Sequence, residues 1–308
     1  DAHAALPERA YDSVFSEDDV AELGQPPHGA KGITSVYHPR MLETVVLESE
    51  TSVVHIAPER GGMATRFTVG GRRVFYLDEA TLTDLTKNVR GGNPVLFPSP
   101  GKLVDDSWTH GKMGQHGFAR SSKWEVTDQT KSAVSLRLTA NDATRAVYPW
   151  NFVASYIYRL DGPKLRIEQR FESFGEKPMP FGAGFHPYFH VPQAEKAHAR
   201  IPTQAKRAWD NVAKREIEMP ERIDLTAKEV DLHLHAHGGP RAALELRDAR
   251  IDIRCSEEFE RWVVWTQEGK DFVCLEPWTS PGNALNSGEG LLFTPPPREL
   301  WTEISVSQ

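Results

Sequence analysis

Two stretches of the chain carry side chains that could transfer protons. In FGAGFHPYFHVP, the alternate positions His186, Tyr188 and His190 would share one side of a strand, because successive side chains of a strand point to opposite faces. In FVCLEPW, Glu276 follows an apolar run that is typical of a strand buried on both faces. Burial there would raise the pKa of the glutamate toward values useful at neutral pH. The alternatives are a solvated edge strand for the histidines and a glutamate in solvent just past the strand end.

Three other positions carry side chains suited to holding a polar ligand. Arg90 stands near the head of a Gly- and Pro-rich segment, VRGGNPVLFPSPGKL, and its five fixed donors suit sugar hydroxyls or a phosphate. His116 precedes Gly117, a residue type that lets the backbone approach a ligand closely. Trp278 could offer an apolar platform for a sugar face. A surface arginine and a structural histidine are the alternatives for Arg90 and His116.

Metal and cofactor signals are weak. His233, His235 and His237 in DLHLHAHGG imitate the spacing of metal ligands, but no cysteine or carboxylate motif accompanies them. The chain has no GxSxG elbow, no P-loop and no Gly-rich dinucleotide fingerprint after a strand. We therefore predict a protein that uses no metal and no cofactor.

The elements that must position these residues are antiparallel strands. In 164–172, apolar residues alternate with charged ones, and the segment follows FVASYIYRL and the turn dipeptide Asp161-Gly162, which predicts a hairpin. Similar alternation marks 133–138 and 251–256. Two strands joined by a turn at 267–270 and a last strand over 299–307 complete the pattern, with short helices expected only at 16–23 and 79–87. We expect an all-β sandwich or barrel.

Bulk properties narrow the class of protein. The 308 residues carry a net charge of -7, so we expect no nucleic acid and no membrane-surface partner. No apolar run approaches the roughly 20 residues of a membrane helix, and no signal peptide is visible. The two cysteines, Cys255 and Cys274, fit buried free thiols of a cytoplasmic protein. Residues 1–40 are expected to form a loosely structured N-terminal extension, and 41–308 a single domain.

Four ordered motifs give the chain a family resemblance. RGGNP from Arg90, HGFAR from His116, FHPYFH around His186 and CLEPW around Glu276 resemble the aldose 1-epimerase family, including its hexose-6-phosphate epimerase-like members. The likeness runs over roughly residues 42–306. It implies a large antiparallel β-sandwich, the galactose mutarotase-like supersandwich, with a sugar bound in an open cleft.

The resemblance also implies roles for individual residues. By motif, His186 would be the general acid and Glu276 the general base, while Arg90 and His116 would bind the sugar. The family also uses an aspartate between its two catalytic strands. Asp210, in RAWDNVAKRE, is our candidate for that aspartate, with Asp231 as the alternative.

The predicted function is the interconversion of α and β anomers of a hexose or related aldose by ring opening. A noncatalytic carbohydrate-binding sandwich and a hexose-6-phosphate 1-epimerase are the alternatives. A cupin-like metalloprotein could instead use His186, His190 and a glutamate, whereas a glycosidase would want two carboxylates where one is evident. Whether the sugar is phosphorylated, and whether the protein is a monomer or a homodimer, stay open.

Overall fold

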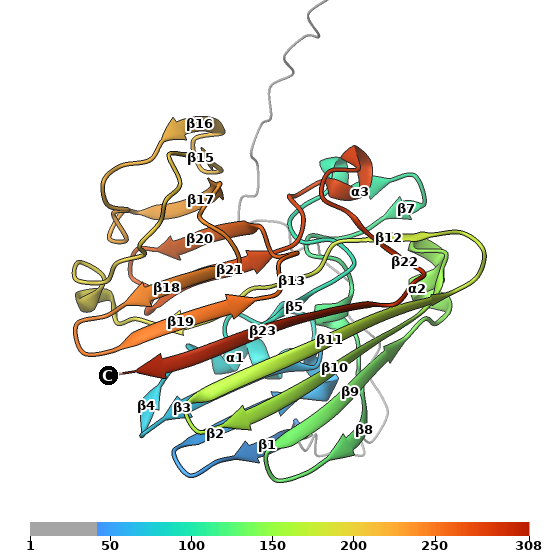
Figure 1. The fold of residues 1–308 in the computed structure, drawn as a ribbon, viewed down its shortest axis with the longest axis horizontal. Coiled ribbons are helices and arrows are strands. Elements are labelled where there is room, and N and C mark those ends of the chain that lie inside the picture. The colour runs from blue at the N-terminus through green and yellow to red at the C-terminus, as the bar shows by residue number, and fades with distance from the viewer. Residues whose placement is uncertain (1–41, 308) are drawn as a thin grey trace, which may run out of the picture. The chain divides into compact units, whose positions relative to one another are not determined.

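The computed structural model describes residues 42–307, and strands are the main regular element of this part (Figure 1). The predicted N-terminal extension, 1–40, and the helix expected at 16–23 lie outside the described residues. Among the helices of residues 42–307, none is long and apolar enough to span a bilayer.

A seven-stranded antiparallel sheet forms one layer. Its strand order is β18-β19-β23-β11-β10-β9-β8. The bounds are β8 Glu125–Gln129, β9 Ala133–Thr139, β10 Asn151–Asp161, β11 Lys164–Phe174, β18 Arg241–Glu245, β19 Arg250–Cys255 and β23 Arg298–Ser307. The predicted hairpin is confirmed, because β10 and β11 pair along their whole length up to Asp161 opposite Lys164.

An eight-stranded sheet forms the second layer and carries most of the candidate residues. Its order is β16-β15-β17-β20-β21-β13-β5, and β14 also pairs with β21. The bounds are β5 Val95–Leu96, β13 Gly184–Phe185, β14 Tyr188–His190, β15 Arg207–Asp210, β16 Arg215–Glu218, β17 Glu229–His235, β20 Arg261–Gln267 and β21 Phe272–Trp278.

Smaller elements complete the described part. A four-stranded sheet contains β1 Val45–Glu48, β2 Ser52–Ala57, β3 Met63–Val69 and β4 Arg72–Arg73. Two-stranded sheets pair β6 Ser107–Trp108 with β7 Gly111–Lys112 and β12 Met179–Phe181 with β22 Leu292–Thr294. The helices are short: α1 Glu79–Thr83, α2 Asp142–Val147, α3 Ala284–Ser287, η1 Pro58–Arg60, η2 Val104–Asp106, η3 Ala119–Ser121 and η4 Gln193–Glu195.

One hydrophobic core joins the sheets. It takes Leu165 and Ile167 from the seven-stranded sheet, and Leu232 and Val264 from the eight-stranded one. The inward faces of β17 and β20 thus pack away from water, as in other sandwiches. Their outward faces are left free to build a cleft.

The segment 181–192 differs from the single strand that we expected. It forms β12, β13 and β14 with breaks between them, and His186 and Pro187 lie in the gap between β13 and β14. Proline has no N–H to donate, so it interrupts the ladder with β21 at this point. The short helix expected within 79–87 is confirmed as α1.

Candidate active site

Strand register places the predicted acid opposite the predicted base. Gly184 pairs with Trp278, and Tyr188 pairs with Cys274, so the position midway between the two pairs sets His186 against Glu276. Residues opposed in this way across an antiparallel pair share one face of the sheet and come into contact. His186 Nε2 lies 3.3 Å from Glu276 Oε1.

The backbone around His186 is held by the Gly- and Pro-rich segment. The His186 N–H donates to Pro94 O at 3.0 Å, and the Tyr188 N–H donates to Gly92 O at 2.8 Å. Gly92 has φ +62°, and a Cβ there would stand 2.5 Å from Ala64 O. Only glycine fits this backbone and this approach. The first and third sequence motifs thus form one rigid unit.

Burial controls the charge of the pair. Only 11% of the His186 side chain and 2% of the Glu276 side chain are exposed. Burial raises the pKa of Glu276 well above its usual range, with nearby Asp231 adding to the effect. Burial lowers the pKa of His186 to about 3, and the positive charge of Arg120 contributes. Both shifts favour neutral side chains, so we infer that the pair keeps one exchangeable proton to a higher pH than a solvated glutamate would.

Trp278 is placed to orient the glutamate. Its indole Nε1–H donates to Glu276 Oε2 at 3.1 Å, which leaves Oε1 to face His186. The Trp278 ring is only 3% exposed, and the rings of His116 and His233 approach it edge-on. Trp278 lines the cleft, but little of its ring is open to a ligand. The structure instead gives Trp278 a positioning contact.

A cleft of about 600 Å³ lies over this face of the eight-stranded sheet. That volume is ordinary for a small-molecule site. Alternate residues of β17 and β20 line this cleft, because residues two apart on a strand point to the same side. The side chains from these two strands that line it include Glu229, Asp231, His233, His235, Arg261, Val263, Trp265 and Gln267.

The three clustered histidines therefore have separate surroundings. His233 lies 3.3 Å from Asp231 and lines the cleft, and His235 pairs with Glu216 at the rim. His237 is buried away from the cleft, where its Nδ1 meets the Thr203 hydroxyl at 2.8 Å. Of the residues in 42–307, these three do not converge as a set of metal ligands.

Strand parity separates the two aspartate candidates. Asp210 stands opposite Leu232, whose side chain faces the core, and its carboxylate caps the β15–β16 turn by accepting from Val212 N and Ala213 N at 2.9 Å. Asp231 lies on the other face, in the cleft. Its carboxylate also accepts from Asn211 Nδ2 at 2.6 Å. The structure brings Asp231, and not Asp210, to the predicted pair.

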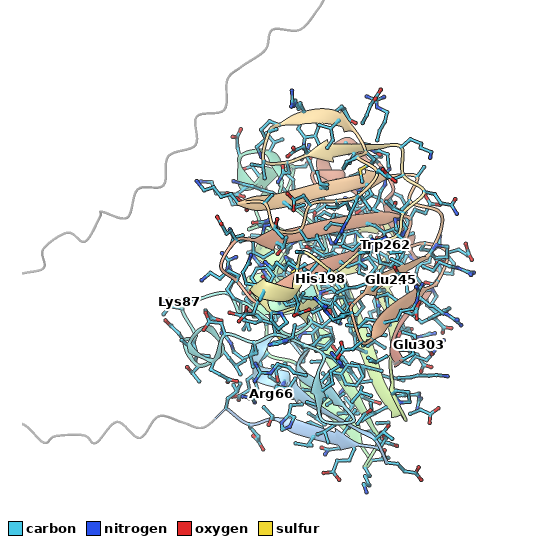
Figure 2. All side chains as sticks on the ribbon, turned by 90° about the vertical axis from the view of Figure 1, so that its left-hand side faces the viewer. Arg66, Lys87, His198, Glu245, Trp262 and Glu303 are labelled. Carbon is cyan, nitrogen blue, oxygen red and sulfur yellow. The ribbon has the colours of Figure 1, made fainter. Side chains whose placement is uncertain are left out.

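Arg90 lies at the rim, on a loop that other groups hold in place. The Arg90 guanidinium lies 5.6 Å from the ring centroid of Trp265. The backbone N–H of Arg90 donates to Thr81 Oγ1 at 2.8 Å. The buried Arg60 donates to the carbonyls of Thr81, Asp84 and Lys87 at 2.7 to 3.2 Å. Figure 2 shows the segment around Lys87 standing out from the strands. A buried guanidinium thus anchors the loop that presents Arg90.

His116 is fixed as a hydrogen-bond donor to the cleft. It is 4% exposed, and its Nδ1 accepts the Gly101 N–H at 3.0 Å. Burial lowers its pKa well below the usual value, so the ring is neutral and carries its proton on Nε2. Gly117, with φ +72°, leaves no room for a Cβ, which would lie 2.2 Å from Phe97 O.

Two cleft residues had no role in the sequence-based prediction. Arg120 ends the HGFAR motif and lines the cleft, where burial lowers its pKa. Trp265 meets the His186 ring edge-on at 5.7 Å. For Trp265, the available signal was its position, two residues from Val263 on a strand that pairs with β21. For Arg120, only the motif itself was available.

His190 does not join the predicted pair. It is half-buried and lines a different recess, with Arg72 and Arg73. Four strand residues span about 13 Å, which is too far for a second contact with the same ligand atom. The ligand set expected for a cupin-like site is therefore not brought together.

Comparison with known proteins identifies the family of the chain. The sequence model of the family described as aldose 1-epimerase matches residues 43–299. LacX from Lactococcus lactis is 23% identical over 64% of this chain and 77% of its own length. A protein of Cenchrus ciliaris named "Putative glucose-6-phosphate 1-epimerase" is 25% identical over 80% of this chain and 74% of its own.

Solved structures share the fold. The Slr1438 protein of Synechocystis sp. PCC 6803 is 38% identical, with a TM-score of 0.84 over 87% of this chain and 97% of that one. A galactose mutarotase related enzyme from Lactobacillus acidophilus is 20% identical, with a TM-score of 0.68 over 86% and 98%. The predicted all-β, galactose mutarotase-like architecture is confirmed.

Proposed function

The chain belongs to the aldose 1-epimerase family, and we propose that it interconverts the α and β anomers of an aldose with His186 and Glu276 as its acid and base. The observation that carries the proposal is the 3.3 Å approach of His186 Nε2 to Glu276 Oε1 at the floor of a cleft. Asp231, His116 and Arg90 line the same cleft and are our candidates for binding the sugar.

Ring opening needs one donor and one acceptor. Glu276 would remove the proton of the C1 hydroxyl while His186 Nε2–H protonates the ring oxygen, and the bond from C1 to the ring oxygen breaks. The aldehyde turns about its C1–C2 bond and closes on the other face, which returns both protons. Each of the acid and base contributions is worth about 10² to 10⁴ in rate.

The single shared proton fits this cycle. In the free protein, burial favours the proton on Glu276. A bound sugar adds hydroxyl donors to the one that Trp278 already gives the carboxylate, and such hydrogen bonds favour the charged form. We propose that substrate binding shifts the proton from Glu276 to His186. The base is then deprotonated and the acid protonated, as ring opening requires.

Removal of either group tests the assignment. Glu276→Gln and His186→Asn should each fold normally and lose anomer exchange by about 10² or more, because each deletes one proton-transfer partner. Saturation-transfer NMR measures the exchange, and circular dichroism with a thermal scan checks the fold. Near-wild-type exchange in a well-folded Glu276→Gln protein would remove the catalytic assignment.

A 6-phosphorylated hexose is a second candidate substrate. Arg90 and Arg120 both line the cleft, and no carboxylate within residues 42–307 forms an ion pair with either. Guanidinium groups without an ion pair suit a phosphate. A comparison of glucose, galactose and glucose 6-phosphate decides: a kcat/KM that is highest for glucose 6-phosphate and falls selectively in Arg120→Met supports the phosphosugar. Equal values for glucose and its phosphate exclude it.

A further inference from the structure

Cys274 gives the proposed catalytic pair a third potential metal ligand. It lies two residues before Glu276 on β21 and opposite Tyr188, so its side chain points to the face that carries His186. One ligand atom each from His186, Cys274 and Glu276 lie within 4.8 Å of one another. In the described part of the chain, no other trio of His, Cys, Asp or Glu meets that distance.

We propose that these three residues form an inhibitory site for a thiophilic divalent cation, with Zn²⁺ as the reference metal. The ligands would be Cys274 Sγ, His186 Nε2 and a Glu276 carboxylate oxygen. A thiolate with an imidazole and a carboxylate selects Zn²⁺ or a softer ion over Mg²⁺ and Ca²⁺, which take oxygen ligands. The metal would compete with the sugar for the acid and the base.

The existing geometry needs little change to accept the ion. The 3.3 Å from His186 Nε2 to Glu276 Oε1 matches the separation of two ligands that each stand about 2.0 to 2.1 Å from a tetrahedral Zn²⁺. The third ligand, sulfur, bonds at about 2.3 Å, which sets it about 3.5 Å from the other ligand atoms, so Cys274 has to move closer by up to about 1.3 Å. The cleft leaves a fourth position open for water or a sugar hydroxyl.

Charge balance favours a divalent ion. The thiolate and the carboxylate together supply two negative charges, which cancel those of M²⁺, and the neutral imidazole adds none. Binding forms the metal–sulfur, metal–nitrogen and metal–oxygen bonds. It sends the thiol proton and the proton shared by His186 and Glu276 to solvent. No electron is transferred.

The surroundings favour a reversible site over a resident cofactor. The Trp278 indole holds Glu276 Oε2 and so leaves Oε1 free for a metal. In resident sites the second nitrogen of a ligating histidine usually has a partner, whereas His186 Nδ1 is buried with no hydrogen bond among the described residues. A metal at this place would bind without the outer contacts that raise affinity, and would occupy both proton-transfer groups.

Cobalt absorption tests the sulfur ligand, and the chain supplies its own control. Cys274→Ala should lose the thiolate-to-Co²⁺ charge-transfer band in the near ultraviolet. Cys255→Ala should keep it, because Cys255 is buried on β19 in the core and Cys274 is then the only thiol. Cys274→Ser repeats the test with a smaller change in volume. Absence of the band in the full wild-type protein, or its survival in a folded Cys274 variant, overturns the proposal.

Inhibition by Zn²⁺ gives an independent readout. In metal-free buffer, Zn²⁺ should block anomer exchange by the wild type and by Cys255→Ala, and excess sugar should relieve the block. Cys274→Ala should keep most of its activity and need at least about tenfold more Zn²⁺ for the same inhibition. Equal inhibition of all three proteins overturns the proposal. The cobalt spectrum needs no substrate, so its outcome does not depend on the epimerase assignment.

Discussion

At the scale of single residues, the shared proton of His186 and Glu276 predicts an unusual pH profile. If a glutamate and a histidine had ordinary pKa values and did not interact, the glutamate would be charged and the histidine protonated only between about pH 4.3 and about pH 6.5. Burial lowers the pKa of His186 to about 3, so a second proton enters only in strong acid. Burial raises the pKa of Glu276, so the pair loses its remaining proton only at a higher pH. The active window should widen on both sides.

The expected result is a kcat/KM that stays nearly constant from about pH 5 to about pH 7, after subtraction of buffer-catalysed mutarotation. Polarimetry over a series of buffers at constant ionic strength measures it. A narrow bell centred near pH 5.5 would mean that the two groups titrate as separate, solvated side chains. It would contradict the single-proton pair.

Trp278 offers a second residue-scale prediction. Trp278→Phe removes the N–H that Glu276 Oε2 accepts, so the carboxylate form loses stabilisation and the glutamate loses its orientation. We expect kcat to fall about tenfold with KM within about threefold, and the alkaline limb of the pH profile to move upward. Trp262→Phe is the control, because that indole donates to Gly239 O instead and its side chain lies in the core. Equal effects of both changes would reduce Trp278 to a packing role.

At the scale of elements, Arg60 connects η1 to the loop that presents Arg90. Arg60→Met removes the donors to three loop carbonyls, so the loop should loosen while the strands that hold His186 and Glu276 stay in place. We expect KM for the sugar to rise several-fold, and kcat to change less than twofold. Steady-state kinetics across sugar concentrations separates the two.

Arg66→Met is the matched control for Arg60→Met. Arg66 also reaches α1, through an ion pair with Glu79, but its side chain is 43% exposed and holds no loop carbonyl. Figure 2 labels both Arg66 and Lys87 on this side of the molecule. The Arg66 variant should keep its KM. A fall in kcat alone in Arg60→Met would show that the loop contributes to chemistry instead of binding.

The elements also show where sequence reasoning succeeds. Alternation over β9, β10, β11 and β19 predicted the strands and their buried faces, because a strand with one face in the core needs that pattern. The doubly apolar run of β21 predicted a buried Glu276, which is 1% exposed. The break at Pro187 was missed, although proline interrupts a ladder.

The choice between the aspartates needed information that the sequence lacked. Asp210 and Asp231 both stand next to strand-like segments, and which face each occupies depends on the register between β15 and β17. A shift of one residue would exchange the faces. Contacts between distant segments, such as that of Arg120 with the cleft, are likewise invisible until the strands are paired.

At the scale of the whole molecule, the core contains a polar residue that can be tested. Gln169 faces inward on β11, is 2% exposed, and neither atom of its amide group has a hydrogen-bond partner within residues 42–307. Burying such a group without a partner costs about 1 to 3 kcal/mol. Gln169→Met, similar in shape and apolar, should raise the free energy of unfolding by about 1 kcal/mol in urea titrations.

Gln129→Met on the exposed strand β8 is the control, and its free energy of unfolding should change by less than about 0.5 kcal/mol. A loss of stability in Gln169→Met would mean that a buried water satisfies the amide, since removing a satisfied partner is costly. Either sign is informative about the core between the two large sheets.

The two proposed proton-transfer groups face each other in one sheet, His186 between β13 and β14 and Glu276 on β21, whereas Arg90 and His116 come from the longer segments that connect strands. Main-chain pairing sets the first relationship, and loop length and composition set the second. A descendant of this chain could therefore exchange its preferred sugar by altering loops alone and inherit the reaction unchanged. Among relatives of this chain, changes in sugar specificity should therefore appear before changes in the reaction.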